Sequence, residues 1–277
     1  MRVRLPRNKL MKQEYGLVAA GGVSRSFLAR LPGFLAHLGP IKATSFRAAR
    51  RIALSLRRGH AASHYSVLEP CTVIWISVPE AGLEGVLTDL LAQTPIHRTM
   101  IVLVGLVEDS RWPGSLLKAG ARIATLNVVE GSKERTFVAE GHRDTMRVLR
   151  NLFHTEKKKL IELAPRAKPF YFAGMQLSSS LLLPLISAAV ESFRAAGFRQ
   201  TDALAVAGSL SVQAAYAYEK SGRKAWHRKL TVEMRRALEH DIEALRETDP
   251  RLADAYGEGL RHALAYFDRP AARTAAK

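Results

Sequence analysis

The stretch YGLVAAGGVSRSFLARL, residues 15–31, joins a short apolar run to a glycine-containing turn and a helix-forming segment. This order of strand, turn and helix is typical of the first unit of a dinucleotide-binding α/β fold. In the fingerprint G-x-G-x-x-G, the glycines permit a tight turn, close approach of backbone to a pyrophosphate, and close helix packing. Ala19, Gly21 and Ser24 occupy these three places, so only the middle glycine is kept.

The turn nevertheless retains features of an anion site. Gly22 adds backbone freedom. A helix beginning near Val23 would point free N–H groups at an anion, with Ser24 and Arg25 close enough to assist. The alternative is a tight turn that binds nothing, and the motif alone leaves both interpretations open.

The end of the second apolar run favours a phosphate ligand. A site for NAD usually has an acidic residue about 20 residues on, which accepts hydrogen bonds from the ribose hydroxyls. No acidic residue occurs between Glu14 and Glu69, and the run ends in TSFRAARR, residues 44–51. Ser45, Arg47 and Arg50 therefore stand where the 2′-phosphate of NADP would lie, although a basic solvated helix is the alternative interpretation.

Apolar runs and helix-length segments alternate through the first part of the chain. The pattern, with helices expected at 81–91 and 143–153, predicts a doubly wound, largely parallel α/β sheet of Rossmann type. A proline directly follows one run, at Val78-Pro79. The runs are GLVAA (16–20), IKATS (41–45), TVIWISV (72–78), MIVLVGL (100–106), ARIATLNVV (121–129), RTFVAE (135–140) and KKLIEL (158–163).

Strand signals cease after residues 164–170, and the remainder predicts an all-helical domain. Residues 172–196 form one long apolar helix that Pro184 should kink, and helices follow at 200–219, at 232–246 and from TDP (248–250) to about 267. A helix at 172–196 with so little polar surface must be buried on several sides, and we expect a second subunit to cover part of it. We therefore expect a basic tail at 1–14, a Rossmann-like domain at 15–165 and a helical, dimerising domain at 166–277.

Composition limits the remaining possibilities. Of the net charge of +17, residues 1–70 supply thirteen Lys or Arg against Glu14 and Glu69. A solvated basic tail explains the first twelve residues better than nucleic-acid binding does. The single cysteine, Cys71, suits a reducing cytoplasm, and LLLPLISAAV (181–190) is too short to span a bilayer. His60 and His64 have metal-ligand spacing but lack further ligands in a loop-like stretch, so no metal site is expected.

Six segments in this order resemble the 6-phosphogluconate dehydrogenase-like superfamily, which includes ketopantoate and pyrroline-carboxylate reductases. The resemblance covers residues from about 15 to 267. It is greatest to a branch with a Rossmann-like NADP-binding domain and a helical C-terminal domain of unknown function. The segments are GLVAAGGVSRSF, TSFRAARR, WISVPEAGL, GARIATLN, KPFYFAGMQLSSSLLLPL and ETDPRLADAY.

The resemblance implies NADP as cofactor, a homodimer formed through the helical domain, and a small-molecule substrate. Hydride transfer to a carbonyl or imine needs a group that stabilises developing negative charge. Asn127, Lys168 and Ser179 are the candidates for catalysis, with Tyr171 as a further polar group. The residues predicted to contact the cofactor are Ala20, Gly21, Gly22, Val23, Ser24, Ser45, Phe46, Arg47, Arg50, Val78, Pro79 and Gly105.

Two other functions stay open. Ala19, Ser24, Leu106, Phe172 and Ser180 stand where the family has glycines or polar groups, as in a catalytically degenerate binding or interaction module. Nucleic-acid binding through the basic N-terminal region is the weaker alternative.

Overall fold

The computed structural model describes residues 14–20, 27–129, 135–226 and 232–267, with backbone alone at 232–235 and 267. It divides the chain into two compact units, Met1–Phe172 and Ala173–Lys277. The division falls inside helix α6 (Lys168–Leu177), slightly beyond the predicted boundary at 165/166.

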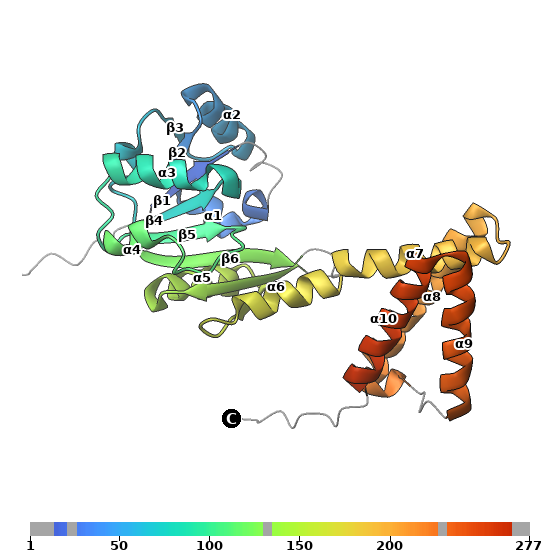
Figure 1. Cartoon of the computed structure of the whole chain (residues 1–277). Helices are drawn as coiled ribbons and strands as arrows, with labels where there is room; N and C mark the ends of the chain where they lie inside the picture. Colours follow the sequence, from blue (N-terminus) through green and yellow to red (C-terminus); the bar gives the residue numbers. More distant parts are fainter. Residues whose placement is uncertain (1–13, 21–26, 130–134, 227–231, 268–277) are drawn as a thin grey trace, which may run out of the picture. The chain divides into compact units, whose positions relative to one another are not determined.

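The first unit is built on one sheet of eight strands in the order β3-β2-β1-β4-β5-β6-β7-β8 (Figure 1). All neighbouring strands are parallel except β6 and β7, which run antiparallel. This confirms the predicted doubly wound α/β sheet. The strands are β1 (Tyr15–Ala19), β2 (Leu38–Ala43), β3 (His60–Ala62), β4 (Val73–Ser77), β5 (Met100–Val104), β6 (Arg122–Val129), β7 (Thr136–Gly141) and β8 (Lys159–Glu162).

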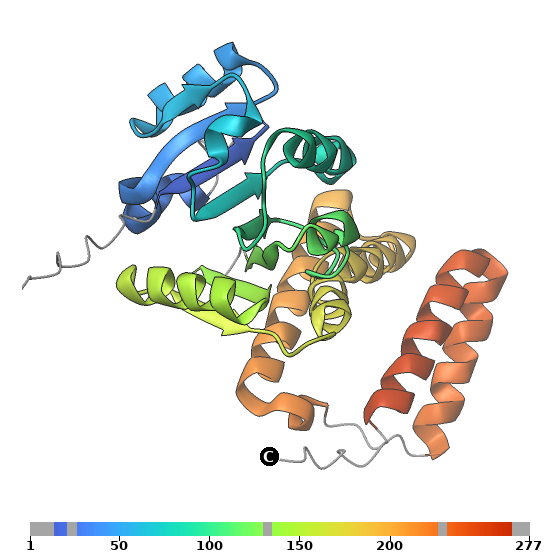
Figure 2. The same ribbon diagram turned by 90° about the vertical axis from the view of Figure 1, so that its left-hand side faces the viewer.

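Helices cover both faces of the sheet, because the central strands are apolar on both sides. Figure 2 shows the helices on the two sides of the sheet. One core lies under α1, α2 and α5, and the other lies under α3 and α4. On β1, Leu17 faces the first core and Val18 the second. The helices of this unit are the 3-10 helix η2 (Phe27–Arg30), α1 (Pro32–His37), α2 (Phe46–Leu56), the 3-10 helix η3 (Tyr65–Leu68), α3 (Glu80–Gln93), α4 (Gly114–Lys118) and α5 (Arg143–Thr155).

One short element was missed. The stretch around His60 was expected to be a loop, but His60–Ala62 forms the edge strand β3, which pairs with Pro40, Ile41 and Lys42 of β2. Three residues are too few to give a recognisable alternation of apolar and polar side chains. The pairing therefore depends on the neighbouring strand rather than on the local sequence.

The second unit is entirely helical within its described residues. Its last helix begins as predicted, because Asp249 accepts hydrogen bonds from the backbone N–H groups of Arg251 and Leu252, and Pro250 occupies the first turn. The elements are the 3-10 helix η4 (Ser180–Leu182), α7 (Leu183–Ala195), α8 (Gln200–Ser221), the 3-10 helix η5 (Gly222–Ala225), α9 (Val232–Thr248) and α10 (Pro250–Phe267).

The prediction of one long helix at 172–196 with a kink at Pro184 is wrong. Helix α6 ends at Leu177 and α7 begins at Leu183, so Pro184 lies in the first turn of a new helix. Proline is tolerated there because the first N–H groups of a helix have no partner within it. The hydroxyls of Ser178 and Ser179 donate to the carbonyls of Gly174 and Met175, which helps to end α6.

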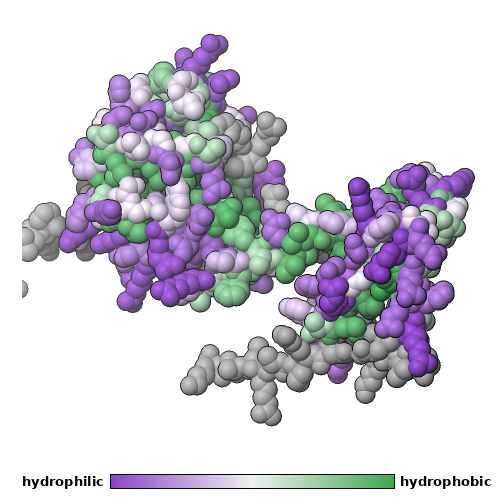
Figure 3. Space-filling view, in the orientation of Figure 1, coloured by the Kyte–Doolittle hydropathy of each residue, from purple (hydrophilic) through white to green (hydrophobic). Residues whose placement is uncertain are grey.

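The helical unit buries few of its apolar side chains. Val190, Ala203 and Ala207 form a small core, while many large apolar residues remain at the surface (Figure 3). Among the described helices, the stretch Lys168–Ala195 is the one that is long and apolar enough to cross a membrane by length and composition alone. The exposed side chains include Leu177, Leu181, Leu183, Leu185, Leu204, Leu210, Val212, Tyr216 and Tyr218.

Candidate functional site

The carboxyl ends of the parallel strands form the edge at which open α/β sheets bind their ligands. At this edge a backbone hydrogen bond joins the carboxyl ends of β1 and β4, because the N–H of Ala20 donates to the carbonyl of Ser77 over 3.2 Å. The backbone of β1 and β4 is therefore fixed up to the residue before the predicted turn. Four predicted cofactor contacts, Gly21, Gly22, Val23 and Ser24, lie outside the described residues.

Helix α2 begins at the same edge with an arrangement suited to an anion. Ser45 precedes its first turn, and the Ser45 hydroxyl accepts a hydrogen bond from the N–H of Ala48 over 3.1 Å. The first turn holds no acidic residue. Arg47 and Arg50 are exposed, and neither forms an ion pair with any residue that the structure describes. Phe46, also a predicted contact, is 52% exposed.

This arrangement fits the 2′-phosphate of NADP better than the diol of NAD. A ribose diol needs a carboxylate acceptor at the end of β2. The structure has instead the first two turns of a helix, with two guanidinium groups that no described residue pairs with, and guanidinium donors suit phosphate.

The ends of β4 and β5 lie next to each other, because Ile76 pairs with Leu103. Val78 and Pro79 lead into α3, and Gly105 follows β5 with φ +80°, a conformation that side chains disfavour. The space between these ends is about 10 Å³, which is room for a single water at most. Of the predicted contacts, Val78 and Gly105 line this small space, and Pro79 follows Val78 at the start of α3.

Buried polar side chains hold the loop that follows Gly105. Asn127 of β6 donates from its amide nitrogen to the carbonyl of Leu106 over 3.2 Å, and the ammonium of Lys168 donates to the carbonyl of Glu108. Asn127 is 8% exposed and Lys168 is 2% exposed. Two of the three predicted catalytic candidates are therefore brought to one loop.

The strand register explains how Lys168 reaches this loop. Val104 pairs with Leu126, Leu126 with Ala139, and Ala139 with Glu162. The last residue of β8, Glu162, is therefore aligned across the sheet with the last residue of β5, Val104. Helix α6 begins shortly after β8, and Lys168 in its first turn contacts the loop that follows β5.

Glu140 is a buried carboxylate that the sequence analysis did not single out. One oxygen accepts from the N–H of Ser110 over 2.7 Å and from the hydroxyl of Thr125 over 2.9 Å. The other accepts from the hydroxyl of Ser110 over 2.8 Å. Its signal was a single acidic residue at the end of the apolar run RTFVAE. Glu140 thus completes the set of side chains that fix residues 105–110.

Burial has a large effect on Lys168. Removal from water lowers the pKa of its ammonium from 10.5 to about 8, although the nearby carboxylates of Glu140 and Asp109 favour the charged form. The aromatic ring of Phe172 lies 5.8 Å from the ammonium. A lysine with a pKa near 8 can give up a proton near neutral pH, which an ordinary lysine cannot.

The other polar candidates have different surroundings. Ser179 belongs to the helical unit and is exposed, and its hydroxyl donates to the carbonyl of Met175 over 2.6 Å. Tyr171 is half-buried in the first unit, and burial raises the pKa of its hydroxyl. Lys168 belongs to the first unit and Ser179 to the helical unit.

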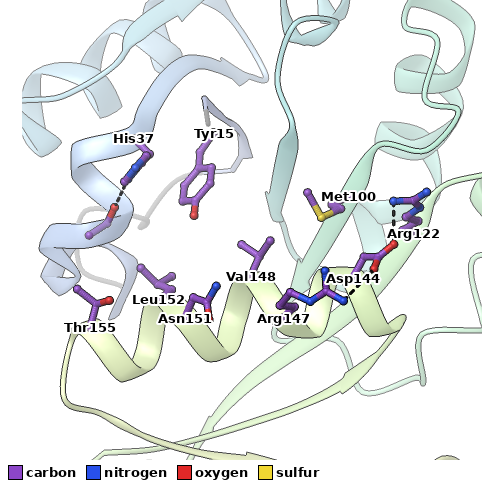
Figure 4. Close-up of a pocket in the computed structure, with 11 residues that line it drawn as sticks. Tyr15, His37, Met100, Arg122, Asp144, Arg147, Val148, Asn151, Leu152 and Thr155 are labelled. Carbon is purple, nitrogen blue, oxygen red and sulfur yellow. Dashed lines mark hydrogen bonds and ion pairs between the residues drawn. The ribbon is translucent and has the colours of Figure 1, made fainter. Parts of the chain in front are cut away.

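A larger cavity, of about 530 Å³, lies at the opposite edge of the sheet (Figure 4). Tyr15, Met100 and Arg122, which line it, stand at the starts of β1, β5 and β6. Arg122 forms an ion pair with Asp144 of α5 over 2.8 Å. Because ligands of open α/β sheets bind at the carboxyl ends of the strands, this cavity is not part of the candidate dinucleotide site.

Comparison with solved structures identifies similar folds along nearly the whole chain. A Bacteroides fragilis protein assigned to the NADP oxidoreductases is 11% identical, with a TM-score of 0.71 over 94% of this chain and 99% of that one. A reductive aminase of Aspergillus terreus, solved with NADPH, is 15% identical, with a TM-score of 0.60 over 92% and 94%. A pyrroline-5-carboxylate reductase of Coxiella burnetii is 12% identical, with a TM-score of 0.50 over 92% and 98%. No family model and no curated protein matches the sequence.

These likenesses show the fold, which is a Rossmann-like sheet followed by a helical region. They agree with the resemblance to the 6-phosphogluconate dehydrogenase-like superfamily.

Replacing Lys168 with methionine tests its lowered pKa. Between pH 8 and 10.5 the folded protein has lost a proton that the unfolded chain still holds, so Lys168 makes the free energy of unfolding rise with pH. The stability of the wild type relative to Lys168→Met should therefore increase across this range in urea unfolding. Lys118→Met, at an exposed position of α4, is the control. A difference for Lys168→Met that does not change with pH would show that its pKa is ordinary.

Proposed function

We propose that this protein is an NADP(H)-dependent oxidoreductase that transfers hydride to or from a small carbonyl, imine or hydroxy-acid substrate. The observation that carries the proposal is the start of α2, where Ser45 and two arginines without an ion-pair partner in the described part of the chain replace the acidic residue of an NAD site. The NADPH bound to the reductive aminase of the same fold supports it.

In this proposal the turn at 21–24 would hold the pyrophosphate, and Ser45, Arg47 and Arg50 would hold the 2′-phosphate. Ala20, Phe46, Val78, Pro79 and Gly105 would line the rest of the dinucleotide. When bound, the cofactor supplies or accepts the hydride.

Lys168 is the candidate proton donor, because its pKa of about 8 lets it carry and release a proton near neutral pH. Asn127 positions the loop after β5 through the carbonyl of Leu106. Ser179, in the helical unit, remains a further candidate.

NADPH should bind more tightly than NADH. Arg47→Glu should remove most of that preference, because a carboxylate repels the 2′-phosphate and can accept from a ribose diol. Fluorescence titration of the tryptophans with each nucleotide measures this. Arg57→Glu, beyond the other end of α2, is the matched control and should keep the preference. Equal binding of NADPH and NADH by the wild type would refute the cofactor assignment.

Turnover separates the enzyme from the alternative of a catalytically degenerate module. We expect NADPH oxidation with a member of a panel of keto acids and cyclic imines. The rate should fall as pH rises through about 8, because Lys168 then loses its proton. Lys168→Met should reduce the rate by about 100-fold or more and remove this pH dependence. Turnover with no member of the panel would favour the binding module.

We also propose that the helical unit pairs with a second copy of the chain. Its exposed apolar side chains are too numerous for a stable monomer surface, and the first helices hardly bury their apolar residues. Closed symmetric dimers are the commonest way in which soluble proteins cover such a surface.

Size-exclusion chromatography with light scattering should therefore give twice the 30.6 kDa mass of one chain. Leu210→Lys combined with Val212→Lys should produce monomer, because both side chains are exposed on α8. Gln213→Lys on the same helix is the control. A monomeric wild type that floats with phospholipid vesicles would show that a membrane covers this surface instead.

A further inference from the structure

We infer that the first unit has a second anion site, which takes a compact, multiply charged anion such as a short polyphosphate and is separate from the proposed dinucleotide site. It is a cavity of about 380 Å³ with five basic residues in its wall. We call it the basic cavity, and its described lining consists of Phe27, Arg30, Leu31, Arg135, Phe137, Lys157, Lys158 and Lys159.

The fold brings these charges together from separate parts of the chain. Strands β7 and β8 begin side by side, with Thr136 paired with Lys159, so Arg135 enters beside the lysines. Lys157 follows helix α5 with φ 53°, a turn closed by the N–H of Lys158 donating to the carbonyl of Phe153 over 2.9 Å. Arg30 comes from the 3-10 helix η2, more than a hundred residues earlier in the chain.

The floor of the basic cavity is rigid and apolar. Phe27 packs edge-on against Phe137 with ring centroids 5.2 Å apart, and Phe137 packs on Phe153 of α5 at 4.4 Å. Phe137 and Leu31 are each 1% exposed. The backbone that carries Arg30 and Arg135 is therefore fixed by the core rather than by the charges themselves.

Among the residues that the structure describes, no carboxylate compensates the charges of the basic cavity. No acidic residue belongs to its described lining, and none of the five cations forms an ion pair with a described residue. Lys157 and Lys158 lie close to the carboxyl end of α5, which attracts cations, but Arg30 and Arg135 belong to other elements. Like charges held around one cavity repel each other, and a multivalent anion removes that repulsion.

The size of the basic cavity favours a compact ligand over a polymer. A volume of about 380 Å³ falls within the usual range for small-molecule sites. Strands β1, β4, β5 and β6 lie between the β7–β8 wall of the cavity and β2, after which the 2′-phosphate is proposed to bind at α2. The wall that carries Arg30 belongs to η2, which follows the turn proposed for the pyrophosphate, so titration in the presence of NADPH is needed to distinguish the two sites.

Calorimetric titration of the full chain with inorganic tripolyphosphate at low salt tests the inference. We expect one anion per chain, with an affinity that falls steeply as salt is added. Lys157→Glu with Lys158→Glu should weaken binding about tenfold or more. The matched control is Arg57→Glu with Arg58→Glu, since Arg57 also follows a helix with φ 53°. It should change the affinity less than about twofold.

Two further titrations keep the inference distinct from the proposed cofactor site. Arg47→Glu should leave the binding of tripolyphosphate unchanged, and so should saturation with NADPH. If either abolishes it, the anion occupies the dinucleotide site and the inference is overturned. Equal weakening by the Lys157 and Arg57 double variants would overturn it too, because the net charge of +17 alone would then explain binding. A single-stranded decanucleotide that binds through Lys157 and Lys158 while tripolyphosphate does not would assign the surface to nucleic acid.

Discussion

The conformation of the loop that follows β5 depends on the requirement that buried polar groups form hydrogen bonds. Asn127, Lys168 and Glu140 are buried, and each forms a hydrogen bond with the loop that follows β5. In a medium of low dielectric an unpaired amide, ammonium or carboxylate costs far more than a pairing gains, so the loop and the three side chains fix each other. The edge at which a dinucleotide would lie is therefore set by groups that come from β6, β7 and α6.

The large elements of the sheet were predictable because their local and tertiary preferences agree. The runs at 72–78, 100–106 and 121–129 are apolar on both faces. Such runs are buried on both sides only as central strands of a sheet that is covered by helices. The start of α10 was equally clear, because Asp249 and Pro250 are suited to a helix N-terminus by their own chemistry. These features follow from neighbours within a few residues.

The remaining features depend on partners distant in sequence. Glu140 and Lys168 carry ordinary local patterns, and their importance comes from the alignment of β5 to β8, which places both beside residues 105–110. The predicted kink at Pro184 is wrong, because whether a proline kinks a helix or begins one depends on where the preceding helix stops. Of the predicted cofactor contacts, the structure describes the group at α2 and at the ends of β4 and β5, whereas the turn at 21–24 lies outside the described residues.

The antiparallel pairing of β6 with β7 limits which insertions and deletions this protein can tolerate during evolution. Side chains alternate between the two faces of a strand, so a slip of one residue between β6 and β7 would carry Glu140 to the far side of the sheet and leave Ser110 and Thr125 without their acceptor. A single-residue insertion inside either strand would therefore keep Glu140 on this loop only if a β-bulge absorbed the extra residue. The register of β6 and β7 fixes the position of Glu140. Related proteins that keep both Lys168 and Glu140 should therefore keep this register as well.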